Sequence, residues 1–263
     1  MLRTVLAMAA AGAGLAFGQS NAPRPEFEVA SVRVNTDNGR SDFEPRRSGD
    51  RIIMHNMQIG PMITYAYNVP RGIPMEGNWR LPDGWNWYDV EATIGESRSG
   101  HTDAEIRLMF QSLLEDRFKL KVHHETKELP IYTLTLAKKG PKLKEWRQGE
   151  PPLTVIGKLV PDGIVANYSS REDPHHIVGR KASMAKLAEY LTGALQSPVT
   201  DKTALAGDFD FELAWDSDEP ALASPDPALV AAVLQEQLGL KLEKSKGPVE
   251  ILVVDHVEKP SGN

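Results

Sequence analysis

Two pairs of adjacent histidines, His123-His124 and His175-His176, are the residues of this sequence best suited to chemistry. Imidazole nitrogens bind zinc and transfer protons near neutral pH, so each pair is a candidate metal or catalytic site. Neighbours on a strand point to opposite faces, so the two members of a pair cannot easily chelate one ion. A metal site needs a further ligand, such as Glu125 or the other pair, and the spacings match no zinc module. The alternative is that both pairs are solvated or packed side chains of hairpins and turns.

A second group consists of acidic residues that alternate with apolar ones. Asp208, Asp210 and Glu212 occupy every second position, and Asp89 and Glu91 repeat the pattern. On a strand, alternate side chains share one face, so these carboxylates line up. Asp89 and Asp210 would then be ligands of a calcium or paired-carboxylate site where the two similar units of the chain, described below, meet. The alternative is the polar outer face of two half-buried strands.

The densest aromatic cluster is Trp79, Trp85, Trp87 and Tyr88, within GNWRLPDGWNWYDVEA. Aromatic residues beside Pro and Gly can line a ligand groove or a protein-binding patch, and they can equally cap a small core. The sequence contains no cysteine, no G-x-S-x-G elbow, and no phosphate-binding glycine loop after residue 18. These absences exclude thiolate sites and lower the expectation of catalysis. No cofactor is indicated.

Two amphipathic helices are predicted to position these residues. Thr102 and Glu105 form a capping box ahead of apolar residues at helical spacing that continue to Phe118. In the second helix, Asp226 is the cap and Gly239 the stop signal. After each helix we expect a strand of period two, then a turn, then a second β-rich run.

The two helix–strand segments are similar to each other. Residues 113–136, LLEDRFKLKVHHETKELPIYTLTL, match residues 233–255, VLQEQLGLKLEKSKGPVEILVVD, and upstream YDVE matches FDFE. We interpret the match as a tandem duplication. Each unit is predicted as strand, helix, strand, helix, strand, strand, which indicates an α+β fold with helices packed on a mainly antiparallel sheet.

The predicted organisation has four parts. Residues 19–140 form the first α+β unit and residues 175–263 the second. Residues 141–174, rich in Pro, Gly and charge, form a linker with a hairpin around 161–163. Residues 1–18, MLRTVLAMAAAGAGLAFG, have one arginine, an apolar run and small residues at the end, which is typical of a signal peptide cleaved near Gly18.

Export predicts a periplasmic or extracellular protein. The apolar run of the leader is shorter than the roughly twenty residues that span a bilayer, so we expect no membrane span in the mature chain. The chain has 263 residues and a formal net charge of -6, which gives no reason to expect a nucleic-acid partner.

Several segments together resemble a family of exported, soil-associated bacterial proteins of unknown function. They are MHNM, YDVEA, LLEDRFKLKVHHETKELPIYTLTLAKKGPKL, SMAKLAEYL, PVTDKTALAGDFDFELAW and LQEQLGLKLEKSKGPVEILVVDHVEKPSGN. The resemblance implies export but no established activity and no catalytic residues. Similar domains attached to membrane sensor proteins of the antirepressor type suggest binding or sensing by analogy. The family commonly has glycine where this chain has Ala204.

Two hypotheses of function follow. The favoured one is a non-catalytic binding or sensing module in the cell envelope, whose partner is an unidentified envelope protein or a small ligand. The alternative is an extracytoplasmic hydrolase or metal-dependent enzyme that uses histidines and carboxylates where the two units meet. The alternative predicts that the histidine pairs converge with Asp or Glu in space.

Overall fold

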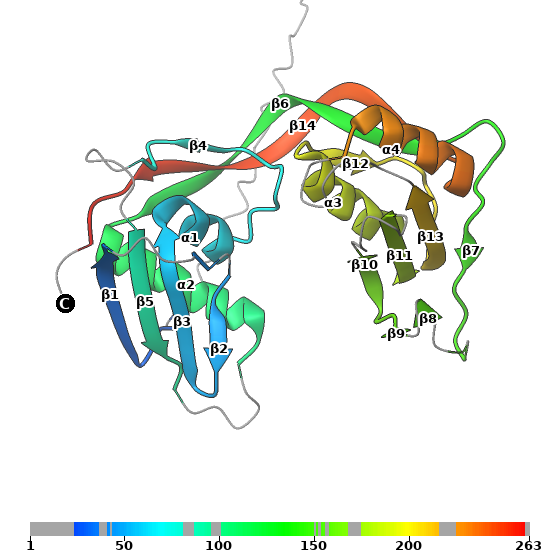
Figure 1. Ribbon diagram of the computed structural model, residues 1–263. Coiled ribbons are helices and arrows are strands. Elements are labelled where there is room, and N and C mark those ends of the chain that lie inside the picture. The colour runs from blue at the N-terminus through cyan, green and yellow to red at the C-terminus, as the bar shows by residue number, and fades with distance from the viewer. Residues whose placement is uncertain are drawn as a thin grey trace, which may run out of the picture.

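A two-stranded ribbon joins two lobes in the computed structural model (Figure 1). The strands of the ribbon are β6 (Lys121–Leu136) and β14 (Leu240–His256), which pair antiparallel from one end to the other. The structure describes residues 24–36, 41–42, 44–80, 87–95, 101–149, 151, 154–155, 158–167, 175–215 and 225–260. Each end of the ribbon packs on a different lobe, so both long strands belong to both lobes.

The first lobe combines two helices with an antiparallel sheet of order β1-β5-β3-β2. Its helices are α1 (Ile59–Ala66) and α2 (Asp103–Phe118). Its strands are β1 (Val29–Asn35), β2 (Arg46–Ser48), β3 (Arg51–Gln58) and β5 (Trp87–Thr93). The core also takes in Leu252 and Val254 of β14, so the ribbon closes the lobe on its open side.

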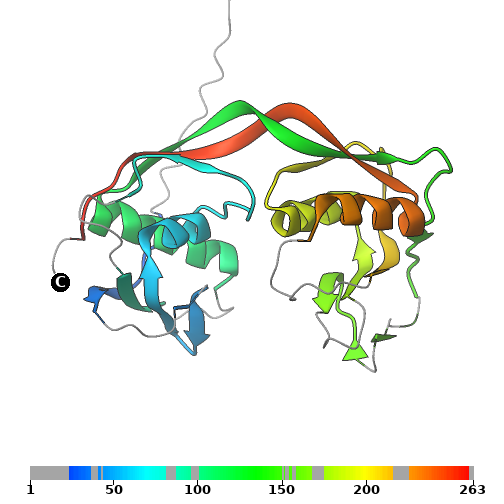
Figure 2. The same ribbon diagram turned by 45° about the horizontal axis from the view of Figure 1, so that its top comes forward.

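The second lobe has the same layers, with a sheet of order β10-β11-β13-β7. Its helices are α3 (Met184–Leu195) and α4 (Pro227–Val233), the latter continuing into the π-helical turn η1 (Leu234–Leu238). Its strands are β7 (Lys144–Glu145), β10 (Gly163–Asn167), β11 (His175–Ala182) and β13 (Phe209–Trp215). Leu134, Leu240 and Leu242 of the ribbon complete its core. Figure 2 shows the helices of each lobe between the ribbon and that lobe's sheet.

Short strands extend the ribbon into a four-stranded sheet of order β12-β6-β14-β4. β4 (Met75–Gly77) runs parallel to β14, and β12 (Val199–Asp201) runs parallel to β6. A separate pair consists of β8 (Thr154–Val155) and β9 (Lys158–Leu159). The fold is therefore α+β with mostly antiparallel sheets, as the sequence predicts.

Local sequence explains where the helices begin. Thr102 and Glu105 form the predicted capping box at α2: the Thr102 side chain accepts from the Glu105 N–H, and the Glu105 carboxylate accepts from the Thr102 N–H. Ser183 caps α3, and Asp226 caps α4 with Pro227 at the first helical position. No helix among the described residues is long and apolar enough to cross a membrane.

The ribbon differs from the sequence-based expectation. In place of the predicted turn after each strand, β6 and β14 run without interruption through the polar stretch HHETKE and through Gly247-Pro248. The reason is that the two strands remain paired through both stretches, with Glu128 opposite Pro248 and Leu129 opposite Gly247. Most side chains of HHETKE are exposed, so solvent exposure rather than chain reversal explains the composition of this stretch.

The two lobes share one order of elements. The first runs β3, α1, β4, β5, α2, β6, and the second runs β11, α3, β12, β13, α4–η1, β14. Two strands from the predicted linker, β7 and β10, pair with the second lobe's sheet. β9 and β10 flank the expected hairpin turn at 161–163, but they pair with β8 and β11. A common origin of the two halves of the sequence stays a prediction.

Candidate functional site

The histidine pairs lie on different elements. His123 and His124 are exposed on β6, where the His123 Nδ1 atom is 2.9 Å from Asp255 Oδ2 and the His124 Nδ1 atom is 3.3 Å from Glu250 Oε1. His175 and His176 begin β11 of the second lobe, opposite β13. Among the described residues, no group of three or more metal-ligating side chains comes together. The convergence that the enzyme hypothesis requires is therefore not present in the described part of the chain.

Asp89 and Asp210 hold matching backbone irregularities, one in each lobe. Asp89 Oδ1 accepts a 2.8 Å hydrogen bond from the Asn56 N–H, and Asp210 Oδ1 accepts a 2.9 Å bond from the Lys181 N–H. Asn56 and Lys181 have φ of 50° and 46° and lie in β-bulges of β3 and β11. A bulge leaves an N–H outside the strand ladder, and the carboxylate satisfies it.

The environment of Asp89 favours its charged form. Partial burial acts to raise the pKa of Asp89, but hydrogen bonds from the Asn56 N–H and the Asn35 side-chain amide outweigh it and lower the pKa. Asp89 and Asp210 thus have a structural role in separate sheets, and their proposed role as ligands of one ion stays a prediction.

The aromatic cluster divides between the core and its edge. Tyr88 is fully buried, and its ring lies 5.1 Å edge-on from Phe118. Trp79 is half-buried against the first lobe's core, with the Arg80 guanidinium 4.7 Å over its ring. Trp87 is half-buried in β5, and Trp85 lies outside the described residues. Tyr88 is therefore a core residue, and the described members do not form one exposed patch.

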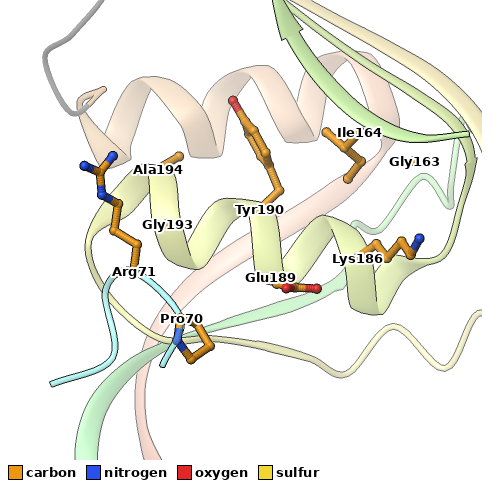
Figure 3. A pocket seen from close by; sticks show the side chains of 9 residues that line it. All are labelled: Pro70, Arg71, Gly163, Ile164, Lys186, Glu189, Tyr190, Gly193 and Ala194. Atoms are coloured by element: carbon orange, nitrogen blue, oxygen red, sulfur yellow. The ribbon is translucent and has the colours of Figure 1, made fainter. Parts of the chain in front are cut away.

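A cleft that sequence reasoning did not identify lies where the two lobes meet. The inter-lobe cleft has a volume of about 520 Å³ and is formed by the segment after α1, the start of β10 and one side of α3 (Figure 3). Its lining residues are Pro70, Arg71, Gly163, Ile164, Lys186, Glu189, Tyr190, Gly193 and Ala194. In Figure 3, the Tyr190 ring stands between Arg71 and Ile164.

A close backbone contact between the lobes positions the cleft. Gly72 has φ of +92°, and a Cβ atom there would lie 2.3 Å from the Thr192 carbonyl oxygen near the end of α3. Only glycine combines this conformation with such an approach. The Thr192 hydroxyl donates to the Ala188 carbonyl and accepts from the Val199 N–H, which ties the end of α3 to β12. Arg71, the neighbour of Gly72 in the chain, therefore lies beside the end of α3, where a Cβ atom at Gly193 would be 3.8 Å from the Arg71 Cβ atom.

The cleft is suited to recognition of a small anion. Arg71 and Lys186 are positively charged, and Glu189 is the one carboxylate among its described lining residues. Tyr190 adds a phenol, and Ile164 and Pro70 add apolar surface. Such a combination can bind a small organic molecule that carries negative charge on one side and apolar groups on the other.

Comparison with known families gives one match. The matching family model covers residues 60–257 and is described as "Protein of unknown function (DUF3738)". The matched region begins one residue inside α1 and ends just after β14, so it includes the ribbon, the rest of α1, the other described helices and both walls of the cleft. No curated protein matches the chain, and no solved structure matches it.

Proposed function

The chain belongs to the DUF3738 family of proteins of unknown function, and we propose that it is a non-catalytic binding module for a small organic anion. The ligand binds in the inter-lobe cleft. The observation that carries the proposal is that the cleft draws Arg71 from the first lobe and Lys186 and Tyr190 from the second. A ligand there contacts both lobes at once and links their relative positions, as a sensing role requires.

The proposed place of action is the cell envelope. Its support is the leader pattern of residues 1–18. N-terminal sequencing of the protein from its host's exported fraction is expected to begin near Gln19. An intact leader in that fraction would contradict cleavage.

Ligand-observed NMR on the mature chain tests the binding proposal. The probes are small carboxylates, phosphate monoesters and sulfonates that carry an apolar group. Arg71→Ala and Tyr190→Ala should abolish or weaken the saturation-transfer signal at least about tenfold, because each removes a contact from a different lobe. Arg33→Ala, at an exposed arginine of β1, is the matched control and should bind like the unmodified chain. Binding that survives both cleft variants, or no binding by any probe, contradicts the proposal.

A further inference from the structure

A second and larger hollow lies on the outer surface of the second lobe. The outer groove has a volume of about 1030 Å³ and lies between α4–η1, the neighbouring end of the ribbon, and the loop that follows β6. The helix makes its π turn at Leu234–Leu238, beside this groove. Such turns are rare and frequently occur at functional sites.

The outer groove combines lysines with an apolar floor. Lys138, Lys139, Lys142 and Lys241 line it, against two carboxylates, Glu236 and Glu243. The Lys142 ammonium donates to the Glu236 carbonyl at 2.6 Å, and Lys241 pairs with Glu243 at 2.6 Å.

Lys138 and Lys139 make no ion pair with a carboxylate in the described part of the chain. Apolar surface is supplied by Leu136, which is 40% exposed, and by Ala231 and Ala232. The groove thus presents unpaired positive charge beside uncovered apolar atoms.

The helix of the first lobe that corresponds to α4–η1 is α2, and its matching surface can be identified by counting residues. α2 and α4–η1 both end at a residue with positive φ, Lys119 and Gly239. Counting back seven and four residues from these ends gives Ser112 and Glu115 in the first lobe, and Ala232 and Gln235 in the second. Ala232 and Gln235 line the outer groove.

Ser112 and Glu115 contact the segment of the chain that precedes β1. The Arg24 guanidinium pairs with the Glu115 carboxylate at 2.5 Å, and the Ser112 hydroxyl donates to the Pro25 carbonyl at 3.0 Å. This segment then enters the sheet, where the Glu28 N–H donates to the Thr93 carbonyl at 2.9 Å. The first lobe therefore carries an extended segment across its helix and onto its sheet edge.

In the second lobe, the side chain of Gln237 occupies the place at the sheet where the first lobe has its covering segment. β5 and β13 correspond in the shared order of elements, and Ala214 lies four residues after Asp210 as Thr93 lies four after Asp89. The Gln237 amide accepts from the Ala214 N–H at 3.0 Å and donates to the Ala214 carbonyl at 2.6 Å. No described segment of the chain crosses the outer groove, and Ala232 and Gln235 occupy the helix positions that correspond to Ser112 and Glu115.

We propose that the outer groove binds an extended acidic segment of a partner protein. In the first lobe, Arg24 of the covering segment pairs with the helix carboxylate Glu115. The outer groove of the second lobe offers lysines instead, so the complementary segment is acidic. In an extended segment, alternate side chains face opposite ways, so one set can reach Lys138 and Lys139 while the other packs on Leu136 and Ala232. This site is separate from the inter-lobe cleft, so it does not depend on the binding of a small ligand.

Fluorescence anisotropy with the full mature chain tests this interface. The probe is a labelled peptide of about ten residues that alternates Glu and Val, with a Lys-Val peptide as the charge-reversed control. The unmodified chain should bind the acidic peptide, and Lys138→Glu with Lys139→Glu should weaken binding at least about tenfold. Lys121→Glu with Lys246→Glu makes the same charge change on exposed ribbon positions and should leave binding within about twofold.

A steric variant separates a peptide site from simple attraction between charges. Ala232→Glu fills the groove from an exposed helix position, where the fold tolerates a larger residue, and should also abolish binding. If the double variant in the groove and the double variant on the ribbon lost peptide affinity equally, the proposal would be overturned, since the loss would reflect only the net charge of the chain. Binding of polyphosphate or phosphatidylglycerol vesicles at the same lysines, with no binding of the peptide, would also overturn it and would assign the groove to a non-protein anion.

Discussion

On α2 of the first lobe, Ser112 and Glu115 contact the chain's own segment at Arg24 and Pro25, whereas on the matching helix of the second lobe Ala232 and Gln235 face an open groove. The layers and order of elements are the same in both lobes. The difference lies in what covers the helix. The two lobes therefore share an architecture that serves as a scaffold, and we infer that the function of each lobe depends on the helix surface that the chain leaves uncovered.

The β-bulges and the left-handed residues at the helix ends, by contrast, occur in both lobes. Each lobe has a bulge whose left-handed residue, Asn56 or Lys181, is bonded by the side chain of Asp89 or Asp210. Each lobe also places a left-handed residue between its last helix and the ribbon. These repeated features belong to the scaffold, and perturbing them tests how alike the two lobes are.

The largest effect is expected at the helix ends. A Cβ atom at Gly239 would lie 2.1 Å from the Gly140 carbonyl oxygen, so Gly239→Ala should lower the free energy of unfolding by at least about 2 kcal/mol through backbone strain and this clash. Lys119 already carries a side chain at φ of 53°, so Lys119→Gly should raise the same free energy by about 0.5–1 kcal/mol. Urea denaturation measures both. Changes of the same sign would show that the two helix ends are not equivalent.

An intermediate effect is expected at the two bulges. Asp89→Ala removes acceptors for the Asn56 N–H and the Asn35 amide and should cost about 2 kcal/mol. Asp210→Ala removes the acceptor of one N–H, that of Lys181, and should cost about 1 kcal/mol. Urea denaturation at neutral pH measures the loss of unfolding free energy in each variant. A larger cost at Asp210 would contradict the bonding described for the two sheets.

The lowered pKa of Asp89 adds a pH dependence to this comparison. Because the folded state holds the carboxylate at a lower pKa than the unfolded state, its contribution is present above the unfolded value and is lost as the pH falls through the folded value. The difference in unfolding free energy between the unmodified chain and Asp89→Asn should therefore shrink below about pH 4. If this difference in unfolding free energy grew as the pH fell, the pKa of Asp89 would not be lowered in the folded state.

The smallest effect is expected at the segment that covers α2. Arg24 and Glu115 are both substantially exposed, so Arg24→Ala should change the free energy of unfolding by less than about 1 kcal/mol. The Arg24→Ala variant tests whether the segment before β1 stays on α2 without the ion pair. Hydrogen exchange at Glu28, whose N–H donates to Thr93, reports this directly, and faster exchange there would show that Arg24 holds the segment on the helix.

Short-range patterns in the sequence predicted the helices well. The Thr102 capping box, the cap at Asp226 and the glycine stop at Gly239 are all observed, because these signals act within one turn of helix. The α+β class followed from the same periodicity. The uninterrupted ribbon did not, since only the pairing of β6 with β14 shows that a polar stretch is an exposed strand and not a turn.

The candidate site was harder to predict for the same reason. The exposed side of α3, with Lys186, Glu189 and Tyr190, follows from helical periodicity in the sequence. Nothing local shows that Pro70 and Arg71 of the other lobe lie against it, because that contact depends on the path of the chain after α1. The alternation of Asp89 and Asp210 with apolar residues was recognised, yet their bonds to bulge N–H groups depend on strand register.

Carbene footprinting of the full mature chain, with and without the acidic Glu-Val peptide, tests the difference between the lobes most directly. We expect Ser112 to be weakly labelled in both samples, while Leu136, Ala232 and Gln235 are labelled in the free chain and protected by the peptide. Equal labelling of the two helices in the free chain, or labelling of Ala232 and Gln235 that the peptide does not change, would contradict it.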